Sequence, residues 1–134
     1  MPGQLPAPIV QSFVVCREVI HDQHANLFVL LAPLSRMPLK LVAFPAQVSV
    51  SVYAQLTGGH GHYEVGLALR DMDEEVLWNW QPGGLQQHDP LEPHELSLNN
   101  MPLPFPRPGK YELVLLASGQ VIARHLLWCG EKEA

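Results

Sequence analysis

The chain has 134 residues, of which 47% are hydrophobic and only 16% are charged, and its formal net charge is −5. This length allows one domain with a substantial core and is too short for two ordinary domains. Eight Lys and Arg residues without a basic cluster argue against nucleic acid as a partner, and the low content of charge leaves room for a self-association surface.

The first part of the chain predicts an extended lead-in followed by a strand. Residues 1–8 carry three prolines, and a strand is predicted from Ile9 to Ile20. The apolar run in its middle, Phe13 to Cys16, is too short for a signal-peptide core or a membrane span, so a cytoplasmic protein without a membrane partner is expected. In a reducing compartment Cys16 and Cys129 are expected to be free thiols.

A second strand is predicted at Leu27 to Leu31, and Leu39 to Ala46 is predicted as a crossing segment. The most regular alternation of apolar and polar residues follows them. From Gln47 to Leu56 apolar and polar residues alternate, and the alternation resumes from His62 to Arg70 after Gly58-Gly59. A period of two is typical of a half-buried strand. With a two-residue glycine turn, every apolar residue of one strand would face an apolar residue of the other. The sequence therefore predicts a β-hairpin at the centre of one sheet.

The second half of the chain predicts further short strands separated by turns and prolines. An acidic turn at 71–75 is interpreted as solvated, with a calcium site as the alternative. In the strand that follows, Trp78 and Trp80 are expected to face the core, with a sugar-stacking platform as the alternative. The remaining predicted segments are a loop at 82–93, a strand at 96–98, a proline-rich bridge at 102–108, strands at 111–117 and 121–128, and a charged tail at 130–134.

Eight predicted strands without helical periodicity indicate an all-β sandwich or barrel. The segment Pro108-Gly109-Lys110-Tyr111 favours the sandwich. A turn that leads into a Tyr at the start of the penultimate strand is the arrangement of the tyrosine corner in immunoglobulin-like domains. We therefore predict a single-domain, immunoglobulin-like antiparallel β-sandwich of about 7–9 strands, occupying residues 9–129.

Five short segments are spread over the chain from about Val10 to Trp128, and their order and spacing form a pattern. They are Cys16-Arg17-Glu18-Val19-Ile20 with Asp22, Leu56-Thr57-Gly58-Gly59, Asp89-Pro90-Leu91, Phe105 to Glu112, and Ile122-Ala123-Arg124 with Leu126-Leu127. Together they resemble a bacterial domain-of-unknown-function family of small immunoglobulin-like β-sandwich proteins. The resemblance implies a stand-alone domain and carries over no functional residue. Where that family often has Arg or Lys after the paired glycines, this chain has His60.

Four histidines are the candidate binding residues. His60 and His62 lie on the polar face of one predicted strand, about 7 Å apart along it, which is close enough for two imidazoles to converge on a metal ion. A metal site needs three or four ligands, and His88 and His94 of the long loop would be the nearest further histidines. The simpler interpretation is that these side chains are solvated. We therefore assign no metal, cofactor or catalytic residue from the sequence.

Two functional hypotheses from different classes follow. The favoured one is a non-catalytic binding or scaffolding module, because immunoglobulin-like sandwiches usually bind through loops or edge strands and the sequence shows no catalytic set. Its partner would be another protein or a second copy of the chain. The alternative is a metal-binding protein or metal-dependent enzyme that uses His60 and His62 with ligands from the 82–94 loop. In either case the tip from Gly58 to His62 is where function is first expected.

Overall fold

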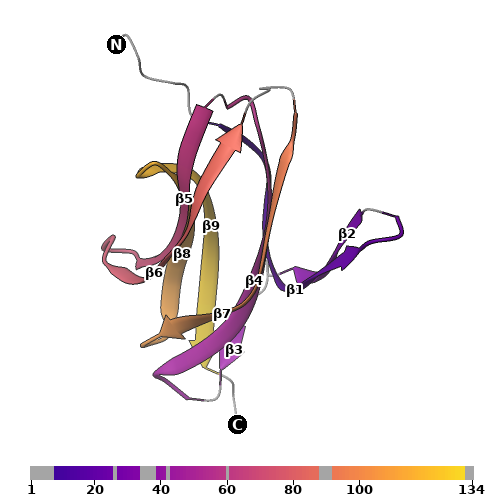
Figure 1. Ribbon diagram of the computed structural model, residues 1–134. Helices are drawn as coiled ribbons and strands as arrows, with labels where there is room; N and C mark the ends of the chain where they lie inside the picture. The colour runs from indigo at the N-terminus through magenta and orange to yellow at the C-terminus, as the bar shows by residue number, and fades with distance from the viewer. Residues whose placement is uncertain are drawn as a thin grey trace.

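Nine β-strands in two sheets make up the part of the chain that the computed structural model describes (Figure 1). That part comprises residues 8–25, 27–33, 39–41, 43–59, 61–87 and 92–131. The strands are β1 (Ile9–Asp22), β2 (Leu27–Pro33), β3 (Leu39–Leu41), β4 (Ala46–Thr57), β5 (Gly61–Asp71), β6 (Val76–Gln87), β7 (His94–Phe105), β8 (Gly109–Ala117) and β9 (Gln120–Glu131). The prediction of an all-β chain is confirmed. The described residues include no helix with the length and apolar character needed to cross a membrane.

The two sheets enclose one core. Sheet A has the strand order β2-β1-β4-β7, and sheet B has the order β3-β9-β8-β5-β6. Neighbouring strands are antiparallel, except that β3 runs parallel to β9. The core takes Val52 and Leu56 from sheet A and Leu67, Leu113 and Leu115 from sheet B, and each is at most 1% exposed. Burying one such side chain contributes about 1.5–3 kcal/mol.

The predicted central hairpin is wrong, because its two strands belong to different sheets. β4 pairs with β1 and β7, whereas β5 pairs with β6 and β8. The connection after β4 therefore crosses from one sheet to the other. It begins at Gly58, whose φ is +74° and whose position would bring a Cβ within 2.8 Å of Cδ1 of Ile9. The alternation correctly predicted which side chains are buried. Val52 and Val65 share the core cluster, but they come from opposite sheets.

Three segments predicted as irregular contain strands. β6 continues through Pro82 to Gln87, and β7 includes Pro102 and Pro104 of the predicted bridge. Proline lacks the N–H that a central strand donates, and β7 tolerates it because it is the edge of sheet A and pairs with β4 alone. In the predicted crossing segment, residues 39–41 form β3 beside β9.

The first and last strands can be compared with the predicted strand and domain limits. β1 begins at Ile9, as predicted, and β9 runs two residues beyond the predicted end at 129. Residues 1–7 of the predicted lead-in and 132–134 of the predicted tail lie outside the described residues. The prediction for the tryptophans is confirmed, since Trp78 and Trp80 pack against the core.

Candidate functional site

The candidate histidines are only partly described. His62 is exposed near the start of β5, and its Nε2 lies 3.0 Å from Oε1 of Glu64. His94 is half-buried at the start of β7. His60 and His88 lie outside the described residues, so the metal hypothesis stays a prediction. Within the described ranges, no three His, Cys, Asp or Glu side chains gather to hold a metal ion.

The end of the sandwich that carries His62 is closed by the turn between β8 and β9. The Ser118 N–H donates to the carbonyl oxygen of Glu64 at 2.7 Å, and the Ser118 Oγ accepts from the Glu64 N–H at 3.2 Å. Both contacts extend the β5–β8 ladder by one residue. The Ser118 hydroxyl therefore serves as a hydrogen-bond partner for the Glu64 backbone.

The two cysteines are buried free thiols, as predicted. Burial raises the pKa of Cys129 to about 11. Burial also raises the pKa of Cys16, although a hydrogen bond to the Glu18 carbonyl acts in the opposite direction. A thiol must ionise to act as a nucleophile, so neither cysteine is suited to covalent catalysis.

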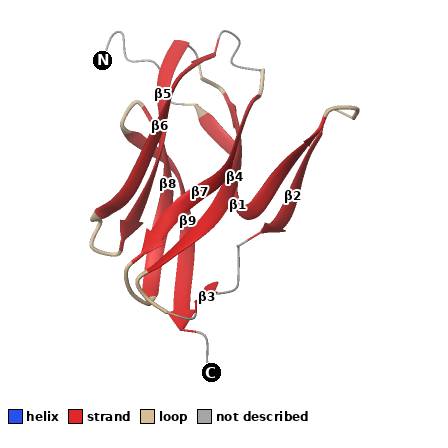
Figure 2. Cartoon of the chain, turned by 60° about the horizontal axis from the view of Figure 1, so that its bottom comes forward, coloured by secondary structure: helices blue, strands red, loops and turns tan. Residues whose placement is uncertain are grey.

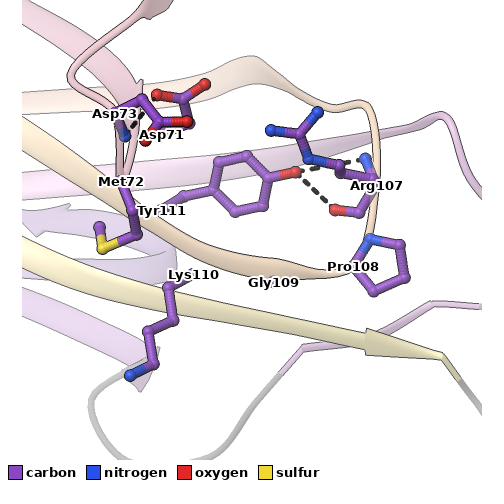
Figure 3. Close-up of a pocket in the computed structure, with 8 residues that line it drawn as sticks. All are labelled: Asp71, Met72, Asp73, Arg107, Pro108, Gly109, Lys110 and Tyr111. Atoms are coloured by element: carbon purple, nitrogen blue, oxygen red, sulfur yellow. Dashed lines mark hydrogen bonds between the residues drawn. The ribbon is translucent and has the colours of Figure 1, made fainter.

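A cavity of about 190 Å³ lies where the β5–β6 turn meets the β7–β8 turn (Figure 3). The Tyr111 hydroxyl donates to the Arg107 carbonyl oxygen at 2.5 Å and accepts from the Arg107 N–H at 3.2 Å. Buried Asp71 accepts the N–H groups of Asp73 and Glu75 at 2.9 and 3.0 Å. The two buried polar side chains of this cavity are thus engaged in holding its turns. The full lining is Asp71, Met72, Asp73, Arg107, Pro108, Gly109, Lys110 and Tyr111.

A projecting hairpin, formed by β1 and β2, is the feature that the sequence reasoning missed. β1 pairs with β4 from Ile9 to Cys16, and from Cys16 to Asp22 it pairs with β2 instead. The second half of β1 therefore departs from β4, and Figures 1 and 2 show the hairpin projecting away from the other strands of the two sheets. The sequence indicated both strands and the turn between them, but nothing local to them indicates this departure.

Side chains from β4 and β7 fix the base of the hairpin. Ser51, which is fully buried, donates from its Oγ to the Arg17 carbonyl oxygen at 3.0 Å. The Asn99 side chain accepts the Val19 N–H and donates to the Val19 carbonyl oxygen, both at 2.9 Å. Asn99 lies at a register shift between β4 and β7, beside Asn100 with a φ of +59°. The bulge lets a β7 side chain replace the backbone partner that Val19 lacks.

The hairpin has one covered and one exposed face. Residues directly across a hairpin share a face. On the covered face the His21 and Phe28 rings stack at 4.7 Å, and Phe28 lies 5.2 Å from the Tyr53 ring of β4. The opposite face exposes three large apolar side chains, Ile20, Leu27 and Val29.

Comparisons with known proteins add no family to this description. A search against protein-family models found no match, and neither did a search of curated proteins. The family resemblance of the sequence therefore stays a prediction.

Proposed function

We propose that the protein is a non-catalytic protein-binding module, built on an immunoglobulin-like sandwich, that engages its partner through the β1–β2 hairpin. The observation that carries this proposal is that β2 is an edge strand, which pairs with β1 alone among the residues that the structure describes. An edge strand presents unpaired backbone N–H and C=O groups, which pair readily with another strand. This edge belongs to the β1–β2 hairpin, which projects away from the other strands (Figure 2).

The immunoglobulin-like assignment is supported by the connectivity. Sheet A contains β1-β4-β7, and sheet B contains β6-β5-β8-β9. This arrangement corresponds to strands A-B-E and C′-C-F-G of immunoglobulin-like sandwiches. The Tyr111 hydroxyl also bonds to the backbone four residues upstream, from the strand that corresponds to F, which is the geometry of a tyrosine corner.

The four sheet edges differ in their protection. β7 carries Pro102, Pro104 and a bulge, β6 carries Pro82 and a register shift, and β3 has only three residues, one of which is Lys40. Such features keep edges from pairing with other chains. β2 has no charged residue, its pairing with β1 has no register shift, and its single proline is its last residue, Pro33. The comparison favours β2 as the binding edge.

Photo-crosslinking in the native cells tests this proposal. A photoreactive phenylalanine analogue is placed at Val29 of the full chain, and in a matched control at Val76, a valine on edge strand β6 that is also exposed. We expect covalent protein adducts from position 29 and not from position 76. Absence of adducts at position 29, or equal yields at both positions, would contradict the proposal.

A further inference from the structure

We infer that the partner strand at the β2 edge is β2 of a second copy of this chain, paired antiparallel across a two-fold axis at Val29. This inference rests on the proposed function, because it names the occupant of the same edge. The dimer would join two hairpins into one four-stranded ribbon in the order β1-β2-β2-β1. The β2 edge of each copy would then be paired.

The sequence of β2 is self-complementary about Val29. An isologous interface uses the same patch on both copies, so each position must suit the position related to it by the two-fold axis. An axis at Val29 pairs Leu27 with Leu31 and Phe28 with Leu30, and it pairs Val29 with itself. Every cross-strand pair in this register joins two large apolar residues, which is the favourable combination between neighbouring strands.

The charges of the hairpin do not oppose this pairing. The chain has a net charge of −5, so two copies carry net charge of the same sign. The charged residues of the hairpin, Arg17, Glu18 and Asp22, all lie on β1. In the ribbon the two β1 strands are three strand spacings apart, about 14 Å. This separation exceeds the screening length of about 8 Å at physiological ionic strength.

The exposed face of the hairpin gains from the same pairing. Leu27 is 62% exposed and Val29 is 44% exposed in the single chain, and both lie on the face that points away from the sandwich. In the dimer each would have a copy of the apolar strand beside it. The contact is one strand wide and smaller than a standard stable interface, so we expect a reversible dimer that forms at micromolar concentrations.

Sedimentation velocity over a range from micromolar to near-millimolar chain concentration tests the inference. The wild-type protein is expected to shift from the 14.9 kDa species towards twice that mass. Val29→Lys places two like charges at the two-fold axis and is expected to weaken dimerisation at least tenfold. The matched control Val76→Lys, a 51% exposed valine on β6, is expected to dimerise like the wild type. Circular dichroism melts verify that all three chains are folded.

Mixing two variants tests the two-fold axis itself. Val29→Lys and Val29→Glu are each expected to be monomeric, and an equimolar mixture is expected to regain the dimer because unlike charges then face each other. The inference is overturned if the mixture stays monomeric or if Val76→Lys, and not Val29→Lys, loses the dimer. It is also overturned if the wild-type chain is monomeric at every concentration. If that monomeric chain still crosslinks from position 29 to a different protein, the proposed function stands and only the second copy is rejected. Absence of any crosslink from position 29 rejects the proposed function itself.

Discussion

Tyr111 shows how one hydroxyl group joins sequence pattern to tertiary structure. The Tyr111 side chain is 2% exposed, its ring packs edge-on against Phe105 at 5.0 Å, and its hydroxyl satisfies both backbone groups of Arg107. The ring is needed for the core, while the hydroxyl holds the turn into β8. A substitution can therefore remove the hydroxyl and keep the ring.

We predict that Tyr111→Phe lowers the free energy of unfolding by about 0.5–1.5 kcal/mol, because the Arg107 N–H and carbonyl oxygen lose their hydrogen-bond partner. Urea unfolding at neutral pH measures this change. The control is Tyr53→Phe, whose hydroxyl bonds to the exposed Glu95 carboxylate at 2.5 Å. We expect the loss there to be smaller, and equal losses in the two variants would show that the Tyr111 hydroxyl has no special structural role.

His125 gives the stability of the protein a dependence on pH. The side chain is half-buried, its ring lies edge-on to Phe13 at 6.4 Å, and Nδ1 has no hydrogen-bond partner among the described residues. Burial lowers the pKa of His125 below the ordinary 6.5, and a hydrogen bond to the Leu126 backbone offsets only part of this effect. The folded chain therefore binds a proton at His125 less readily than the unfolded chain does.

From this shift we predict that the contribution of His125 to the free energy of unfolding does not change with pH well above pH 6.5. As the pH drops through 6.5, the free energy of unfolding falls. The unfolded state takes up the proton first, which favours unfolding at lower pH. Urea unfolding at pH 7.5 and pH 5.5 measures the difference. His125→Phe should reduce it. A pH difference that survives in His125→Phe would assign the effect to other groups.

Among the structural elements, the projecting hairpin depends on residues far from it in the sequence. Asn99 bonds to Val19 across 80 positions of the chain. We predict that Asn99→Ala speeds hydrogen exchange across residues 17–31, because the Val19 backbone loses both partners. Asn79→Ala, at an exposed position on β6, is the matched control and should leave this exchange unchanged. Unchanged protection of the hairpin in Asn99→Ala would show that the Asn99 contacts do not hold it.

Strand pairing marks the point at which prediction from this sequence failed. Alternation indicates which face of a strand is buried, and it did so correctly for Val52 and Val65 and for Trp78 and Trp80. It does not indicate the neighbouring strand, because two strands that face one core from opposite sheets show the same pattern as two strands of a hairpin. The two strands of the pattern, β4 and β5, therefore face each other across the core instead of lying side by side in one sheet.

At the scale of the whole molecule, the features that could be predicted are those set by composition and periodicity. The absence of helical periodicity, the many prolines and the turn before Tyr111 were enough to predict an all-β chain in which the Tyr111 hydroxyl bonds to the backbone upstream. The hairpin position could not be predicted, because it depends on a bulge in β7 and on the side chains of Ser51 and Asn99. The candidate site therefore moved from the tip near His62 to the edge of β2.

One core shared by both sheets also predicts how the whole chain unfolds. Leu56 and Leu103 of sheet A and Leu67 and Leu115 of sheet B belong to one buried cluster, so neither sheet keeps its core face covered without the other. We expect a single cooperative transition, as is usual for domains of this size. Far-UV circular dichroism reports both sheets, and tryptophan fluorescence of a Trp128→Phe variant reports the remaining tryptophans, which lie in β6 of sheet B. The two urea transitions should have the same midpoint and slope, and an earlier fluorescence transition would show that sheet B unfolds on its own.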